Sequence, residues 1–125
     1  MSPHSEFKAL LAGINNVYDG TVPAKPAFPY VLVTSFIPRV GERSINRTVH
    51  SKVERWRTTI AGVNSDSVRI IANRVVGYLE GARIGGWRLE RVPDDFPIWE
   101  DLDFTNPDTG RPLHYTILEW RVTTG

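Results

Sequence analysis

The sequence contains no cysteine, almost no net charge and no long apolar segment, and each of these absences excludes a class of protein. Without cysteine the chain has no disulfide framework, no thiol nucleophile and no thiolate metal site. Fifteen basic and fourteen acidic residues leave a net charge of +1, so no strong overall field draws the chain to nucleic acid or membranes. No apolar run approaches the roughly 20 residues that cross a bilayer. Residues 1–6 lack the start of a secretory signal, so we expect no membrane partner.

The spacing of apolar residues predicts two helices and several strands. With 125 residues there is room for one hydrophobic core, so we expect a single domain over residues 1–125. One amphipathic helix is predicted from Ser2 to Ile14 and a second over 64–79. Short extended pieces over 17–29, counted as the first strand, precede strands predicted at 30–37, 52–62, 87–92, 96–102 and 113–123. Runs of strands with only two helices indicate an α+β fold: a mainly antiparallel or mixed sheet with both helices packed on one face.

The side chains of two predicted strands, 52–62 and 113–123, alternate clearly between two faces, whereas residues 38–51 show no such alternation. Residues 38–51 have neither a helical nor a strand period, which predicts a long loop between the second and third strands. In strand 52–62, Arg55 and Arg57 lie on the face opposite Trp56, so this arginine-bearing face should meet solvent or a partner. Strand 113–123 likewise has two faces: Thr116, Leu118, Trp120 and Val122 on one, and Tyr115, Ile117, Glu119 and Arg121 on the other.

No arrangement of residues in the sequence points to catalysis. The three histidines (His4, His50 and His114) are scattered, with neither a nucleophile arrangement nor the spacing of metal ligands. The glycines at 81–86 follow a helix instead of opening one, unlike a phosphate-binding loop. The carboxylates between 94 and 103 could form a catalytic or metal-binding set, but a solvated acidic edge or an interface explains them better. We therefore expect no enzyme activity, no catalytic residues, no metal and no cofactor.

The small net charge is the sum of two opposed segments. The basic segment, residues 39–57, has six basic and two acidic residues, and its candidate interface residues are Arg39, Arg43, Arg47, Arg55 and Arg57. The acidic segment, residues 94–108, has six acidic residues and no basic one, and its candidates are Asp94, Asp95, Glu100, Asp101 and Asp103. Opposed charges on one subunit favour a head-to-tail interface between identical copies. The alternative is that both segments are solvated edges of a sheet.

Two short stretches resemble a pattern of a known family. Residues 17–23 (VYDGTVP), a proline-rich spacer and residues 29–33 (PYVLV) resemble the strand entry of tail terminators and related tail-completion proteins of long-tailed bacteriophages. The predicted order of helices and strands is also similar over most of the chain. The resemblance implies a non-enzymatic ring, commonly a hexamer, that caps the tail tube, ends its polymerisation and joins the tail to the head connector.

The same resemblance implies the partners and the location. The partners would be further copies of the chain, the tube protein and the connector, with DNA passing non-specifically through the lumen. The ring would lie at the head-proximal end of the tail in the virion, after assembly in the host cytoplasm. We expect the 38–51 loop to be ordered by a neighbour or by the tube. The acidic segment would face either the next subunit's basic segment or the DNA channel.

Two alternatives remain open from the sequence. The chain could be a head-closure or head–tail adaptor protein of the connector, which the fold and charge do not distinguish from a terminator. It could also be a small non-viral α+β binding module whose ligand contacts Trp87, Trp99 and Trp120.

Overall fold

The structure, a computed structural model, describes residues 2–37, 39–43, 49–93, 96–105 and 110–124. The helices there are α1 (Pro3–Leu10) and α2 (Ser65–Leu79), and neither is long and apolar enough to cross a membrane. The strands are β1 (Val17–Asp19), β2 (Tyr30–Ser35), β3 (Arg39–Arg43), β4 (Val49–Gly62), β5 (Arg83–Ile84), β6 (Trp87–Arg88), β7 (Glu90–Arg91), β8 (Trp99–Thr105) and β9 (Pro112–Thr124).

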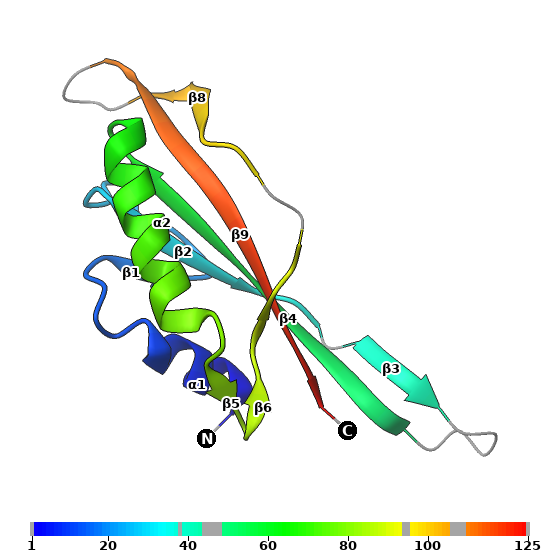
Figure 1. Cartoon of the computed structure of the whole chain (residues 1–125). Helices are drawn as coiled ribbons and strands as arrows, with labels where there is room; N and C mark the ends of the chain where they lie inside the picture. The colour runs from blue at the N-terminus through cyan, green and yellow to red at the C-terminus, as the bar shows by residue number, and fades with distance from the viewer. Residues whose placement is uncertain (1, 38, 44–48, 94–95, 106–109, 125) are drawn as a thin grey trace.

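Seven of these strands form one mixed sheet. Its main order is β1–β2–β4–β9–β7, with β3 paired to β4 and β8 paired to β9. Strand β1 is parallel to β2, and the other pairs in this sheet are antiparallel. Strands β5 and β6 form a separate two-stranded sheet. Both helices lie on the same side of the large sheet (Figure 1), so the predicted α+β architecture is confirmed.

The side of the sheet covered by the helices, here called the helix face, holds the hydrophobic core. Trp56 in β4 and Trp120 in β9 are directly opposite in register, and both are buried there. The ring of Phe7 from α1 stacks on Trp56, with centroids 4.6 Å apart and planes within 7°. Thr58 is buried among them but donates to the Leu118 carbonyl at 3.0 Å and accepts from Trp120 Nε1 at 3.1 Å. The buried hydroxyl of Thr58 therefore has partners, as burial requires.

The ends of the helices follow their capping residues. The backbone N–H of Ser5 donates to Ser2 Oγ at 3.1 Å, and that of Ser67 donates to Asn64 Oδ1 at 2.8 Å. Both bonds satisfy amides that the first helical turn leaves without partners. Helix α1 ends at Leu10, earlier than predicted, although Ile14 still reaches the core from the turn that follows.

The prediction of a long loop over residues 38–51 is wrong for much of that range. Residues 39–43 form β3, which pairs with β4 from Arg39 opposite Val53 to Arg43 opposite Val49. Residue 38 and residues 44–48 lie outside the described residues. The hairpin extends away from the helices (Figure 1), so packing against a helix imposes no apolar alternation on its sequence.

The single strand predicted over residues 87–92 is also wrong. Gly85 and Gly86 have φ of 58° and 85°, the left-handed conformation that a tight hairpin turn requires. This turn folds β6 back onto β5, whereas β7 pairs with β9 in the large sheet. As a result Leu89 is fully buried while Trp87 is 45% exposed, and the two side chains do not share an environment.

Helix α1 is tied to the edge of the sheet by one carboxylate. Asp19 Oδ2 in β1 lies 2.9 Å from His4 Nε2 and 3.1 Å from Lys8 Nζ. Trp56 Nε1 donates to His4 Nδ1 at 3.3 Å, which leaves Nε2 as the nitrogen that donates to Asp19. The hydrogen bond from His4 lowers the pKa of Asp19, with Lys8 acting in the same direction and partial burial opposing them.

This contact predicts a pH-dependent difference between the protein and Asp19→Asn. The pKa of Asp19 is lower in the folded than in the unfolded state, so the ionised carboxylate stabilises the fold fully above the unfolded pKa, about 3.9. This stabilisation is lost as pH falls through the folded pKa. Asp19 is partly exposed, so we expect Asp19→Asn to lower the free energy of unfolding by only about 0.5 kcal/mol near pH 6. Urea unfolding from pH 6 to pH 2.5 should show this gap closing. A gap that is constant with pH would contradict the assignment.

Candidate functional site: the open face and the arm

The side of the sheet away from the helices, here called the open face, carries a row of side chains across four strands. Tyr30 in β2 is opposite Ala61 in β4, Ala61 is opposite Tyr115 in β9, and Tyr115 is opposite Trp99 in β8. Ala61 is only 4% exposed although no helix covers this side. The short methyl group thus lies between two tyrosines that shield it from water.

Further rings extend this row at both ends. Tyr30 contacts Tyr18 and Phe28 at centroid distances of 5.6 and 5.5 Å. At the other end Trp99 contacts Tyr115 at 5.1 Å and Phe96 at 5.8 Å. These distances lie within the favourable range for tilted aromatic pairs. The chain's own aromatic side chains therefore cover one end of the open face.

Tyr30 is perturbed by this environment. Burial raises the pKa of the Tyr30 hydroxyl, and the negative charges of Asp101 and Tyr18 raise it further. Its ring packs against those of Tyr18 and Phe28 within the row.

Towards the arm, the open face carries a group of charges around one buried carboxylate. Glu119 in β9 is opposite Arg57 in β4, and its side chain is 9% exposed. Arg57 donates to Glu119 Oε1 through Nε at 3.0 Å and Nη2 at 2.7 Å, and Arg55 Nη2 lies 3.6 Å from Oε2. Both guanidinium groups also lie over the Phe36 ring, 5.2 and 5.5 Å from its centroid. Arg55 and Arg57, two of the predicted interface residues, are thus held by contacts within their own chain.

Neither Glu119 nor Phe36 was among the predicted site residues. Glu119 was placed on one face of its strand by alternation, but its partners come from a strand about 60 residues away. The alternation of strands 52–62 and 113–123 did contain this information. If the two strands pair antiparallel with their tryptophan faces on the same side, Glu119 lies on the same face as Arg55 and Arg57. Only the register shows that it lies directly opposite Arg57.

A two-stranded extension projects from the sheet. We call it the arm and define it as β3 together with residues 49–53 of β4. Residues 49–51 of β4 pair with β3, and pairing with β9 starts at Lys52. In Figure 1 the arm points away from both helices. The backbone of predicted residues Arg39 and Arg43 lies in β3, and Arg47 lies outside the described residues.

Three of the five predicted acidic residues lie in a strand at a different corner of the molecule. Glu100, Asp101 and Asp103 are in β8, whereas Asp94 and Asp95 lie outside the described residues. Glu100 is 59% exposed, and its Oε1 lies 3.5 Å from His114 Nε2. Figure 1 shows β8 and β3 at opposite ends of the sheet, so these two strands do not meet within one chain.

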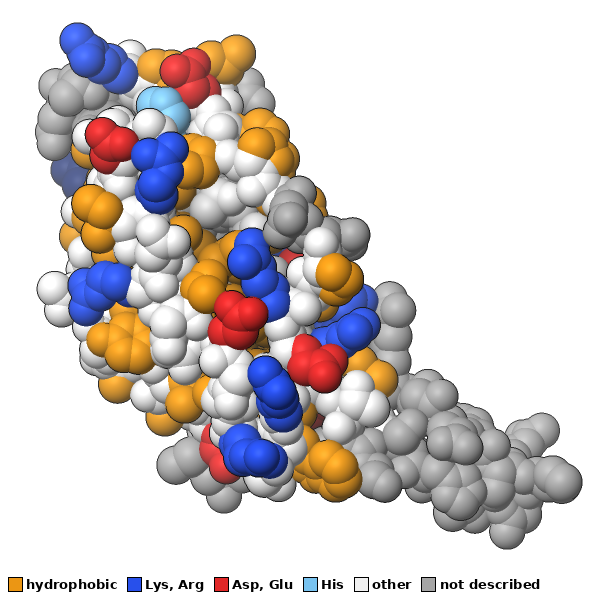
Figure 2. Space-filling model, viewed as in Figure 1, with side chains coloured by type: hydrophobic (Ala, Val, Ile, Leu, Met, Phe, Trp, Pro, Cys, Tyr) orange, Lys and Arg blue, Asp and Glu red, His pale blue; other side chains and the backbone are white. Residues whose placement is uncertain are grey.

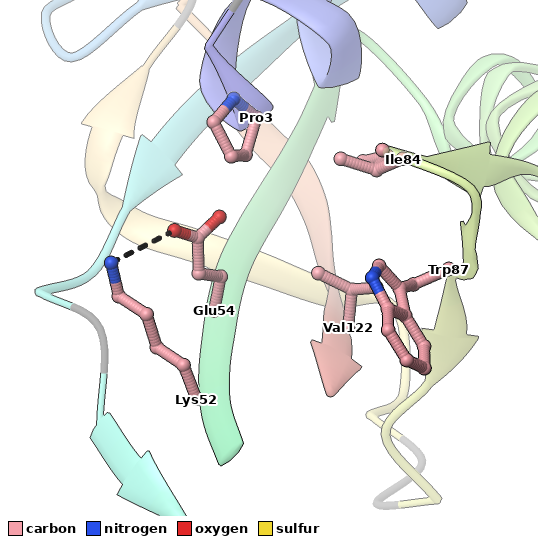
Figure 3. Close-up of a pocket in the computed structure, with 7 residues that line it drawn as sticks. Pro3, Lys52, Glu54, Ile84, Trp87 and Val122 are labelled. Atoms are coloured by element: carbon pink, nitrogen blue, oxygen red, sulfur yellow. Dashed lines mark ion pairs between the residues drawn. The ribbon is translucent and has the colours of Figure 1, made fainter. Parts of the chain in front are cut away.

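The three tryptophans proposed for a ligand site are not brought together either. Trp120 is buried on the helix face, and Trp99 belongs to the row on the open face. Trp87 lines a hollow of about 280 Å³ together with Pro3, Lys52, Glu54, Ile84, Gly85 and Val122. Figure 3 shows this hollow beside the Lys52–Glu54 ion pair, whose closest atoms are 3.8 Å apart. One tryptophan and an ion pair at an open hollow do not make the predicted pocket.

The helix side of the molecule has no large patch of one charge. In Figure 2 basic and acidic side chains are interspersed over the described surface, with apolar side chains scattered between them. Within the described residues, no group of three or more His, Asp or Glu side chains is arranged to hold a metal ion.

No protein-family model matches the sequence, and no curated protein is similar to it.

Replacing Glu119 should destabilise the fold more than replacing an exposed carboxylate on the same face. Glu119→Ala leaves two arginines without their carboxylate, and we expect a loss of about 1–3 kcal/mol in the free energy of unfolding. The matched control is Glu90→Ala, because Glu90 lies 3.5 Å from Arg121 with both side chains about half exposed. That exposed pair should contribute below about 1 kcal/mol. Equal losses in urea unfolding would refute the structural role of Glu119.

Proposed function

We propose that this chain is a structural subunit of a homo-oligomeric ring that closes the head-proximal end of a phage tail tube. The ring would end tube polymerisation and join the tail to the head connector. The proposal starts from the resemblance over residues 17–33 and from the α+β architecture that accompanies it. The observation that carries it further is the arm.

The arm supports a role in assembly because it gains little stability from its own chain. A two-stranded hairpin is at best marginally stable in water without a third strand or a packed helix. Residues 49–51 pair with β3, and neither helix reaches them in Figure 1. A neighbouring subunit or the end of a tube would supply the missing contacts.

The residues that carry the resemblance have a structural role in this fold. Val17, Tyr18 and Asp19 form β1, parallel to Val31–Val33 of β2. The Gly20 amide then donates to the Val33 carbonyl at 2.9 Å, and its φ of 80° favours glycine at that position. The motif thus builds one edge of the sheet, which suits a protein whose function is its shape.

The proposal predicts a closed ring that binds tube ends. Native mass spectrometry should give one defined oligomer of the 14.1 kDa chain, and negative-stain electron microscopy should show a ring with a central hole. Added to tail tubes, the protein should bind at the ends and stop further growth. A chain that stays monomeric at 100 µM and does not bind tube ends would contradict the proposal.

The position of the ring distinguishes the two phage roles. Labelled subunits at the end of isolated tubes indicate a terminator, whereas labelled subunits found only on connectors of tailless heads indicate a head-closure or adaptor protein. The second result would replace the proposed role.

A further inference from the structure

We infer that the arm of one copy docks along β8 of the next copy, with β3 beside β8. This inference rests on the proposed function, because it describes how the subunits of the proposed ring would meet. It assigns the partner of the arm as a second copy of this chain.

Both strands are edges of the large sheet. Within the described residues, β3 pairs with β4 alone and β8 pairs with β9 alone. Both pairings contain register shifts: β3 between Val40 and Arg43, and β8 between Asp101 and Thr105. Such bulges discourage indiscriminate pairing of edges. Specific docking would therefore depend on side chains that match.

The charges of the two edges are complementary. Strand β3 contains Arg39 and Arg43 against Glu42, a net charge of +1. Strand β8 contains Glu100, Asp101 and Asp103 with no basic residue, a net charge of −3. Opposite charges would attract the two edges, whereas β8 against β8 would place like charges together.

Each edge also has an exposed apolar side chain beside these charges. Among the described large hydrophobic residues the two most exposed are Ile37, at 90%, and Leu102, at 76%. Ile37 lies two residues before β3, and Leu102 lies within β8. A contact between the edges would remove both side chains from water, which is favourable by about 25 cal/mol for each Å² buried.

The geometry requires the contact to be between copies. Strand β3 pairs with residues 49–53 of β4, whereas β8 pairs with the part of β9 that lies opposite residues 61 and 62 of β4. The nearest of these positions, residues 53 and 61, are roughly 25 Å apart along the strand at 3.3 Å per residue. Strands β3 and β8 also lie on opposite sides of the β4–β9 pair. Two different surfaces meeting in this way form a head-to-tail interface, which produces a ring when the rotation closes.

A charge-swap experiment tests the inference. Arg39→Glu with Arg43→Glu should raise the protein concentration needed for half-assembly at least tenfold, and Glu100→Lys with Asp103→Lys should do the same. The four substitutions together should restore assembly to within about threefold. The matched controls, Arg69→Glu with Arg88→Glu and Asp66→Lys with Glu80→Lys, change the net charge equally at exposed sites elsewhere and should leave assembly unchanged.

Cysteine cross-linking provides the second measurement, since the native chain has no cysteine. Ile37→Cys or Val40→Cys mixed with Leu102→Cys should give disulfide-linked dimers on a non-reducing gel. Each variant alone should not, because a head-to-tail contact does not bring a residue to its own copy. Ile70→Cys, at an exposed site on α2, is the control and should stay uncross-linked with every partner.

The outcomes separate this inference from the proposed function. Wild-type rings that neither respond to the charge reversals nor cross-link would overturn the inference and leave the ring intact. Charge reversals that weaken assembly without restoring it in combination would also overturn it. A wild-type chain that forms no ring would overturn the proposed function itself.

Discussion

The pairing of β4 with β9 is the constraint on which the rest of the structure depends. It runs without interruption from Lys52 opposite Thr124 to Gly62 opposite His114. Because side chains alternate along both strands, this one register puts Trp56 and Trp120 beneath the helices and Arg57 and Glu119 on the other side. A shift of one residue would bury the arginines and expose the core. Every site described above takes its position from this pairing.

The two faces of the sheet are closed in different ways. The helix face is covered by α1 and α2, whose apolar side chains make the core with Val31, Val33 and Ile60. The open face has no such cover and uses its own side chains instead, with the aromatic row at one end and the Glu119 group towards the arm. Beyond Val53 the hairpin continues past both helices. The arm is thus the part of β3 and β4 that extends beyond the two helices.

How far the sequence predicts this molecule depends on which residues have a core to face. The period of residues 65–79 and the alternation in 52–62 and 113–123 come from core packing, and these elements were predicted with ends close to those found. Strand β3 was missed because an uncovered hairpin is under no pressure to alternate. The Glu119 contacts and the separation of β3 from β8 depend on the register between distant strands, which local spacing does not contain. The two charged segments were identified from the sequence, but the placement of β3 and β8 at opposite ends of the sheet required the fold.

The central claim is that subunits meet edge to edge, β3 against β8. Hydrogen–deuterium exchange on the assembled protein, compared with the same protein diluted to monomer, tests it most directly. The account predicts that exchange slows on assembly at the amides of β3 and β8, while those of β2 and the paired part of β4 are slow in both states. Slowing confined to α2 or to the middle of the open face, with β3 and β8 unchanged, would contradict it.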